Sequence, residues 1–187
     1  MGLYGLEVFG AQVTVVDDPR AIATALPDVR LTVWAAVPRI WEKLKAGIEF
    51  TVANEQDEAT RTVLQWAMSV AAQRAASLVA GEQIPDELAA EWARADELVL
   101  SKLRERRGFG ELRWAVSGAA PIPKETPAFF AGIGIPIAEV WGMSELSAVW
   151  RPSAIPATRA WARSASCCPG WRARSPTTAS SWCAARW

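Results

Sequence analysis

Apolar residues near the start of the chain form two short runs with a helical stretch between them. Ala11–Val16 is rich in β-branched residues and ends at an acidic turn before Pro19, which predicts a strand followed by a turn. Pro19 is suited to open a helix that runs to about Leu26. Leu31–Val37 is a second apolar run and stops at Pro38. Strand, helix and strand in this order predict a right-handed βαβ unit within a parallel sheet.

Three longer helices are predicted next, because apolar residues recur three and four positions apart. The first begins at Pro38, the second spans Ala59–Val79 and the third spans Asp86–Arg107. Together they make a long helical insertion at about residues 39–107, and the arginines near its end complement the helix dipole. The residues expected to face inward are Ile40, Trp41, Leu44, Ile48 and Val52 in the first helix, Val63, Trp66, Ala67, Val70 and Leu78 in the second, and Leu88, Trp92, Ala95, Val99 and Leu103 in the third.

The pattern then returns to strand, helix and strand. Leu112–Val116 and Ile135–Val140 are short apolar runs, and a helix between them is closed by glycines. Polar loops follow the two strands, at Ser117–Pro121 and at Trp141–Ser147. Because ligands bind at the carboxyl ends of strands in open α/β sheets, both loops are candidate binding segments.

Composition narrows the function classes. The chain has 187 residues, 51% of them hydrophobic, and a formal net charge of zero, which suits one domain with a sizeable core and gives no bulk attraction to a nucleic acid. It has no histidine, so catalytic triads and metal sites built on histidine are excluded. No apolar run reaches the length of a transmembrane segment, and no signal-peptide pattern opens the chain. We therefore expect a cytoplasmic protein, with peripheral membrane contact left open.

Three stretches resemble motifs of one enzyme family. Thr32–Ile48, TVWAAVPRIWEKLKAGI, resembles the PT-x-x-x-x-VPR-x-WEK segment of the adenylate-forming (AMP-binding) enzymes. SGAAPIP from Ser117 and EVWGMSE from Glu139 resemble the SGGAPL and EGYGxTE motifs of the same family. A helical stretch between the VPR and SGG motifs is typical of its long-chain fatty-acid–CoA ligases. The resemblance runs from about Val13 to Ala148, with the motifs in the family's order.

The resemblance implies an α/β fold, as a partial N-terminal domain with a parallel-type sheet flanked by helices and a long helical insertion. It also implies a reaction in which ATP converts a fatty-acid carboxylate to an acyl-adenylate, whose acyl group then passes to the thiol of coenzyme A. Mg²⁺ is the implied cofactor, and fatty acid, ATP and coenzyme A are the implied partners. This chemistry needs hydrogen-bond donors and a cation around the phosphate on which charge develops.

Site residues follow from the same resemblance. Glu145 matches the glutamate with which the family holds Mg²⁺, and Ser144 stands where a family threonine contacts the α-phosphate, so both are candidate catalytic residues. Without the resemblance, Glu145 reads as a helix-capping or solvated carboxylate, and Trp41 and Trp141 read as core aromatics. The other implied site residues are Gly118, Ala119, Ala120, Pro121, Trp141, Gly142, Met143 and Ser144 at the nucleotide, and Val37, Pro38 and Trp41 along the acyl site.

The end of the chain differs from the rest in composition. Trp150–Trp187 contains five tryptophans, three cysteines, six arginines and nine alanines, but no Asp, Glu, Lys, Leu or Val. It carries a charge of +6 and leaves −6 for residues 1–149. Written in GC-rich codons, Trp161–Cys168 read from the third base gives GTVGKLL, and the continued reading resembles the family's next segment, GTVGKPLPGVEVRIADDGEILVRGP. We therefore expect a slip of the reading frame near Val149. The alternative is a true tail that contacts a membrane or a nucleic acid.

Two segments are thus expected: residues 1–148 as part of an AMP-binding, acyl-CoA synthetase domain, and residues 149–187 as an out-of-frame, disordered tail. The family's phosphate loop, TSGTTGxPKG, and its C-terminal catalytic lysine match nothing in the 187 residues. We therefore expect a fragment of a long-chain fatty-acid–CoA ligase that is inactive by itself. The alternatives are a helical module built on Pro38–Arg107 that binds another protein without catalysis, and a reading frame that yields no stable protein.

Overall fold

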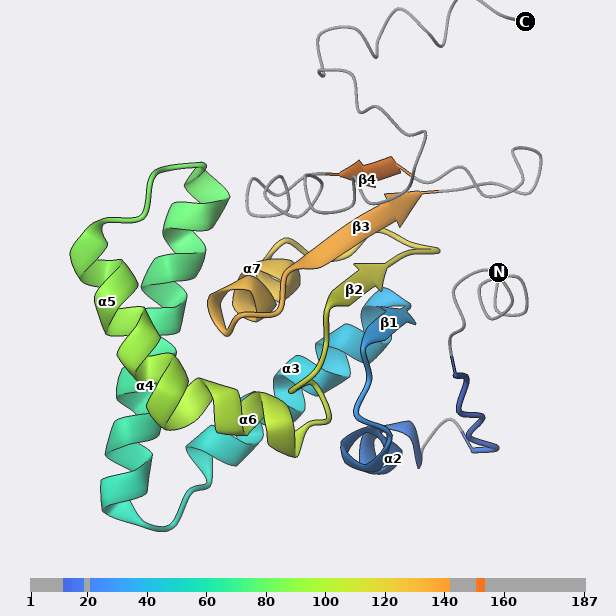
Figure 1. The fold of residues 1–187 in the computed structure, drawn as a ribbon, viewed down its shortest axis with the longest axis horizontal. Coiled ribbons are helices and arrows are strands. Elements are labelled where there is room, and N and C mark those ends of the chain that lie inside the picture. Colours follow the sequence, from blue (N-terminus) through green and yellow to red (C-terminus); the bar gives the residue numbers. More distant parts are fainter. Residues whose placement is uncertain (1–11, 19–20, 142–150, 154–187) are drawn as a thin grey trace, which may run out of the picture.

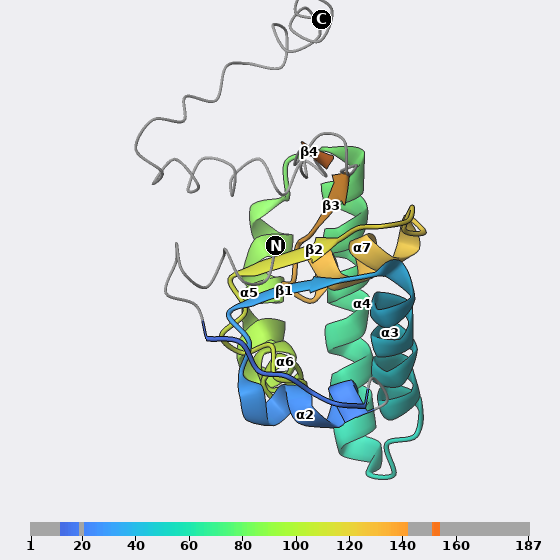
Figure 2. The same ribbon diagram turned by 90° about the vertical axis from the view of Figure 1, so that its right-hand side faces the viewer.

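The computed structural model of the chain describes residues 12–18, 21–141 and 151–153. Its described part contains a small sheet in the order β1 (Val33–Ala36), β2 (Trp114–Ser117), β3 (Ile137–Trp141) and β4 (Arg151–Ser153) (Figure 1). β1, β2 and β3 run parallel, and β4 pairs with β3 in the antiparallel sense. Figure 2 shows the sheet beside the helices that cover it. The architecture is the expected α/β arrangement, with three parallel strands flanked by helices.

Most of the described helices stand between β1 and β2. α2 (Ile22–Val29) precedes β1, and α7 (Glu125–Gly132) links β2 to β3. In Figure 1, α4 and α5 form an antiparallel pair beside the sheet. The predicted insertion is confirmed as α3 (Pro38–Ala53), α4 (Glu58–Ala80), α5 (Asp86–Ala95), a π-helical turn η2 (Asp96–Leu100) and α6 (Ser101–Arg106).

Local sequence signals set the ends of these helices. Pro38 occupies the first turn of α3. Proline lacks a backbone N–H, and in the first turn this costs no hydrogen bond within the helix. Asp57 caps α4 by accepting a hydrogen bond of 2.8 Å from the backbone N–H of Thr60, and its hydrogen bonding to Thr60 lowers the pKa of this carboxyl group. Gly81 ends α4 at φ 72°, a left-handed conformation that glycine adopts without steric cost.

An aromatic cluster ties the first inserted helix to the sheet. Trp41 of α3 is fully buried, and its ring centroid lies 4.6 Å from that of Trp34 in β1 and 5.1 Å from that of Phe130 in α7. The ring of Phe109 contacts both tryptophans. The indole N–H of Trp41 donates a hydrogen bond of 3.2 Å to the carbonyl oxygen of Val116 in β2. Trp41 therefore joins α3, α7 and two strands in one core.

Three side chains of the insertion cap the end of α7. Arg74 of α4, Trp92 of α5 and Arg104 of α6 donate hydrogen bonds to the carbonyl oxygens of residues 131, 132 and 133, at 2.6, 2.7 and 2.8 Å. The last carbonyls of a helix have no partner within the helix, so these donors add hydrogen bonds at groups that depend on partners from outside it. We call the three side chains the α7 clamp. Because the insertion and the α/β elements share one core, the insertion is not a free-standing hairpin.

Two expectations about individual segments are wrong. Residues 12–16, predicted as a strand, pair with no strand of the described sheet, and Val15 is 80% exposed. A β-branched run becomes a strand only where a neighbouring strand pairs with it. Val63 was expected to face inward but is 42% exposed. The buried face of α4 instead consists of Val70 and small alanines, because α7 packs close to that face.

The sheet also gains a strand from the segment predicted to be disordered. Residues 151–153 form β4 at the edge of the sheet, next to β3. Pro152 is compatible with this position, since an edge strand does not need every backbone N–H for pairing. Residues 154–187 lie outside the described residues, and the division of the chain at residue 148 stays a prediction.

Substitution of Gly132 by alanine is expected to destabilise the chain. A Cβ atom at Gly132 would collide with the carbonyl oxygen of Ala71 in α4 and lie 3.3 Å from the Cβ of Ala75, so the two helices would have to separate. We expect a loss of about 1–3 kcal/mol in the free energy of unfolding, measured by urea denaturation. Gly47→Ala is the control, because a Cβ there meets only Arg107 Nη1 at 3.9 Å. That change should be neutral or stabilising by up to about 1 kcal/mol in the middle of α3.

Candidate functional site

The carboxyl ends of the three parallel strands meet at one edge of the sheet. In the strand register, Ala36 of β1 lies beside Ser117 of β2, and Ser117 lies beside Glu139 of β3. The VPR segment leaves β1 at this edge, the SGAAP loop leaves β2, and β3 ends there at Trp141. The three motifs are far apart in sequence, and the parallel pairing brings them together where α/β folds bind ligands.

The loop after β2 is built for close approach of its backbone to neighbouring atoms. A Cβ atom at Gly118 would lie 2.8 Å from Cγ2 of Val140 and 3.2 Å from its carbonyl oxygen, so only glycine fits without a shift. Ala119 has φ 72°, a left-handed conformation that a residue with a Cβ seldom adopts. Strained backbone of this kind clusters at ligand-binding segments. Ala119, Ala120 and Pro121 are exposed, so this predicted nucleotide loop faces solvent.

Ser117 begins the candidate loop Ser117–Pro121, but the sequence alone gave it no site role of its own. It is fully buried in the last position of β2, and its Oγ has no hydrogen-bond partner within the described part of the chain. Buried polar atoms are nearly always hydrogen-bonded, so an unpaired hydroxyl calls for an explanation. A ligand at this edge would supply the missing partner. The residue type offered only a weak signal in the sequence, because a serine before a glycine also reads as an ordinary turn.

Replacement of Ser117 by alanine tests whether this hydroxyl is unpaired. A buried hydroxyl without a partner costs about 1–3 kcal/mol, so Ser117→Ala is expected to leave the free energy of unfolding unchanged or to raise it. Urea denaturation followed by circular dichroism measures the difference. A loss of stability larger than about 1 kcal/mol would contradict the prediction, because it would mean that the hydroxyl is already satisfied by the protein.

The predicted acyl-site residues do not share one environment. Val37 is 46% exposed at the carboxyl end of β1, and Pro38 and Trp41 are buried in the first turn of α3. Through its hydrogen bond to Val116, Trp41 supports the strand end next to Ser117. The structure places it in the core, where it can position β2.

The last motif is described only in part. Trp141 ends β3 and pairs in register with Arg151 of β4. Gly142, Met143, Ser144 and Glu145, which include the candidate catalytic and Mg²⁺-binding residues, lie outside the described residues. Within the described ranges, no group of three or more His, Cys, Asp or Glu side chains could hold a metal ion.

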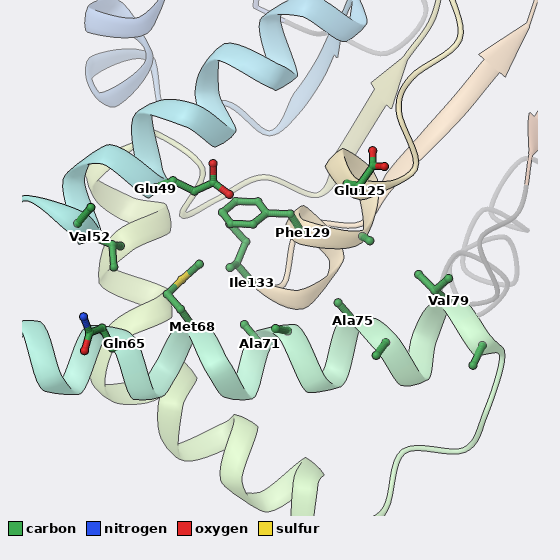
Figure 3. Close-up of a pocket in the computed structure, with 15 residues that line it drawn as sticks. Glu49, Val52, Gln65, Met68, Ala71, Ala75, Val79, Glu125, Phe129 and Ile133 are labelled. Carbon is green, nitrogen blue, oxygen red and sulfur yellow. The ribbon is translucent and has the colours of Figure 1, made fainter.

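Two hollows in the described structure lie away from this edge. One, with a volume of about 870 Å³, lies between α3, α4 and α7. Figure 3 shows it with Met68 and the alanines of α4 below, and with Phe129 of α7 and the following Ile133 above. Its walls are apolar, and Glu49 and Glu125 are the charged residues in its lining. A second cleft, of about 810 Å³, is lined by α2, α3, α4, η2 and α6. Neither hollow includes a predicted site residue.

Comparison with known proteins agrees with the motifs gathered at the sheet edge. A family model described as "AMP-binding enzyme" matches residues 1–174. This chain belongs to the AMP-binding enzyme family. The expected family is thus confirmed, and the match to the AMP-binding enzymes extends past residue 149 into the segment predicted to be out of frame.

Relatives of this AMP-binding chain are named as ligases. A Mycobacterium tuberculosis (H37Rv) protein named as a candidate fatty-acid–CoA ligase, fadD11, is 76% identical over 148 residues, which cover 79% of this chain and 26% of that protein. The Gallus gallus long-chain-fatty-acid–CoA ligase ACSBG2 is 33% identical over 144 residues, 77% of this chain and 18% of the relative. The human ACSBG1 ligase is 33% identical over 142 residues, 74% of this chain and 19% of the relative.

The chain therefore spans about a quarter of the length of the mycobacterial relative (26%) and less of the vertebrate ones. No solved structure significantly matches this AMP-binding chain. Of the helices that the structure describes, none is long and apolar enough to span a membrane.

Proposed function

We propose that this AMP-binding chain is part of a long-chain fatty-acid–CoA ligase and that its sheet edge belongs to the site where a fatty acid and ATP react. In this reaction the fatty-acid carboxylate attacks the α-phosphate of ATP and pyrophosphate leaves. The thiol of coenzyme A then attacks the acyl carbon of the acyl-adenylate, which forms the thioester and releases AMP. The observation that carries the proposal is the meeting of three family motifs at the carboxyl ends of parallel strands. Relatives named as long-chain ligases at 33% identity support the substrate class.

The residues of the three motifs suit the groups that this reaction brings together. The backbone of Gly118–Pro121, exposed at residues 119–121, can approach the nucleotide closely, and the unpaired hydroxyl of Ser117 can hydrogen-bond to a polar group beside it. Trp141 supplies a ring of the kind that stacks against adenine, and Ser144 a hydroxyl for the α-phosphate. Glu145 would hold Mg²⁺, since a carboxylate oxygen suits this hard cation. When bound, Mg²⁺ would neutralise the charge of the phosphates.

We further propose that the 187-residue polypeptide by itself has no ligase activity. It contains neither the family's glycine-rich phosphate loop nor its catalytic C-terminal lysine. A glycine-rich loop can surround phosphates with backbone N–H groups, and a lysine can stabilise developing negative charge. Loss of such preorganised donors typically lowers rates by factors of about 10²–10³ each, so a chain without either falls below detection.

The composition of the tail supports a slip of the reading frame near Val149. A segment that is rich in Trp, Arg, Cys and Ala and free of Asp, Glu, Lys, Leu and Val is typical of GC-rich DNA read out of frame. The helical interaction module is the weaker alternative, because the insertion packs onto α7 and the sheet.

Correction of the reading frame tests these proposals together. The coding DNA across residues 145–161 is resequenced, and the gene is expressed both as printed and as a frame-restored version that includes the upstream and downstream coding sequence with the phosphate loop and the catalytic lysine. The frame-restored protein is expected to form acyl-CoA from palmitate, ATP and coenzyme A, and the 187-residue chain is expected to form none. Glu145→Ala in the restored protein should lower the rate by at least about a hundredfold, because the Mg²⁺ ligand is lost.

The outcomes separate the parts of the proposal. Acyl-CoA formation by the purified 187-residue chain would refute its inactivity. A folded, frame-restored protein that forms no acyl-CoA with any long-chain fatty acid would refute the ligase assignment. An unchanged rate for Glu145→Ala would contradict the Mg²⁺ role of this residue alone.

A further inference from the structure

A cleft with a cationic rim and an apolar floor opens at the far end of α3 from the candidate site. α3 begins at the carboxyl end of β1, whereas Thr51 and Val52 near its other end line the cleft. A helix rises 1.5 Å per residue, so the two ends of α3 are about 20 Å apart. The cleft measures about 810 Å³, which is within the usual size of small-ligand pockets. It is therefore a separate hollow of ligand size.

The rim of the cleft carries unpaired positive charge. Lys102 and Arg106 of α6 line it, are exposed, and take part in no ion pair among those of the described residues. Arg107 is held in place, because its Nη2 donates to the carbonyl oxygen of Gly47 at 3.0 Å and to Thr51 Oγ1 at 2.7 Å. Glu55 is the one acid in the lining. The rim thus has an excess of cations that favours an anion.

The floor of the same cleft exposes apolar side chains to solvent. Val63 of α4 is 42% exposed and Leu98 of η2 is 49% exposed, and both line the cleft with Val99 and Leu103. Large apolar side chains gathered in one concave site are typical of a ligand-binding surface. Val63 was expected to face inward, and its exposed side chain instead forms part of the apolar floor of this cleft.

Together these features select the chemical class of the occupant. An alkyl chain matches the apolar floor, and an anionic head group matches Lys102 and Arg106. Glu55 at the rim disfavours a doubly charged phosphate more than a singly charged carboxylate. The surface is concave, which suits an inserted chain better than the plane of a membrane. The hollow of Figure 3 lacks this match, because the charged residues in its lining, Glu49 and Glu125, repel an anion.

We propose that the cleft between α6, α4 and the end of α3 is a second binding site for a long-chain carboxylate. The carboxylate lies against Lys102 and Arg106, and the alkyl chain covers Val63 and Leu98. This site is distinct from the sheet edge. Its occupation requires no catalysis, so it does not depend on the proposed ligase activity.

Binding of palmitate to the whole chain tests the proposal directly. Titration calorimetry below the critical micelle concentration measures the affinity of the chain as printed, of Lys102→Glu/Arg106→Glu, and of the control Lys43→Glu/Arg94→Glu. The control makes the same charge change at two exposed positions outside the cleft. Circular dichroism confirms that each variant is folded, which the exposure of all four residues favours.

The charge reversal in the cleft is expected to weaken palmitate binding at least about tenfold, since it removes two charge-assisted contacts. The control should change it by less than about twofold, because exposed charges at a distance are screened by salt. Octanoate should bind at least about a hundredfold more weakly than palmitate, since fewer methylene groups are buried. Leu98→Ser should also weaken palmitate binding.

Three results would overturn the second site. The first is equal palmitate affinity in the chain as printed and in the cleft variant. The second is equally tight binding of an uncharged long-chain alcohol, which would exclude a role for the rim. The third is binding to phosphatidylglycerol vesicles without any binding of monomeric palmitate, which would make the face a membrane contact. None of these results bears on acyl-CoA formation by the frame-restored protein, so the two proposals fail independently.

Discussion

Replacement of Trp41 by alanine is expected to lower the free energy of unfolding of this chain by about 3–5 kcal/mol. The side chain is fully buried and touches the rings of Trp34, Phe109 and Phe130, so its removal opens a cavity where β1, β2, α3 and α7 meet. Truncation of a buried aromatic residue to alanine costs about 3–5 kcal/mol. A domain of this size is stable by only about 5–15 kcal/mol in total. The loss is therefore a large part of the free energy of folding.

Urea denaturation followed by far-ultraviolet circular dichroism measures the loss of stability. Two milder variants separate the contribution of ring packing from that of the indole hydrogen bond. Trp41→Phe keeps an aromatic ring but removes the donor to Val116, so we expect a loss of about 1–3 kcal/mol. Trp66→Phe removes an indole N–H that donates to Glu91 at an exposed site and should cost less than about 1 kcal/mol. A Trp41→Ala chain with an unchanged denaturation midpoint would show that the aromatic cluster does not hold the core.

The local elements were predictable because their signals lie within a few residues of each other. Pro38 and the apolar spacing that follows it determine α3, and glycines close α7 before β3. The parallel pairing of β1 with β2 could be expected as well, since a helical connection between two strands of one sheet favours it. The third predicted helix is confirmed along its length, although η2 interrupts it with a π-helical turn that its apolar period does not reveal.

The errors arose where a residue depends on a distant partner. The strand expected at Ala11–Val16 has the right composition, but strand formation requires a neighbour that composition cannot guarantee. Val63 lies in the apolar period of α4, yet α7 packs beside the small residues further along that helix. β4 lies in a segment whose composition argued against order, and its pairing with β3 is a long-range contact.

The motifs placed the candidate site at the sheet edge, but the contacts that support it could not be predicted from the sequence. SGAAP and VPR indicated the sheet edge because parallel strands bring their carboxyl ends together, whatever the residues between them. The unpaired hydroxyl of Ser117 could not be foreseen, because it depends on the packing around the end of β2. From the sequence, Arg104 was expected to complement the dipole of its own helix. In the structure it donates a hydrogen bond to the carbonyl oxygen of Ile133 at the end of α7.

Arg104 holds a partly buried network that supports the strand leading into the candidate site. Its Nη1 lies 2.5 Å from Oδ1 of Asp96 and donates to the carbonyl oxygen of Ile133, while Nη2 donates to Oδ2 of Asp96 at 3.1 Å. Arg74 of the same clamp stacks on Trp92, with Cζ 4.1 Å from the ring centroid. Burial lowers the pKa of Arg74, an effect that Asp96 opposes and Arg104 reinforces. Asp96 therefore offsets the charge of two arginines.

Arg104→Met is expected to destabilise the chain by about 3 kcal/mol, because it leaves Asp96 and the end of α7 without their donor. The control Arg106→Met, on the same helix but exposed and outside the clamp, should change stability by less than about 0.5 kcal/mol. The double variant Arg104→Met/Asp96→Leu should lose less than Arg104→Met alone, since no unpaired carboxylate remains. Urea denaturation of the unchanged chain, Arg104→Met, Asp96→Leu and the double variant completes the double-mutant cycle. Because α7 ends only a few residues before β3, amide hydrogen exchange in Ile137–Trp141 should speed up in Arg104→Met and not in Arg106→Met. Equal exchange in both variants would mean that the clamp stabilises the insertion alone and does not position the strand that carries Trp141 to the site.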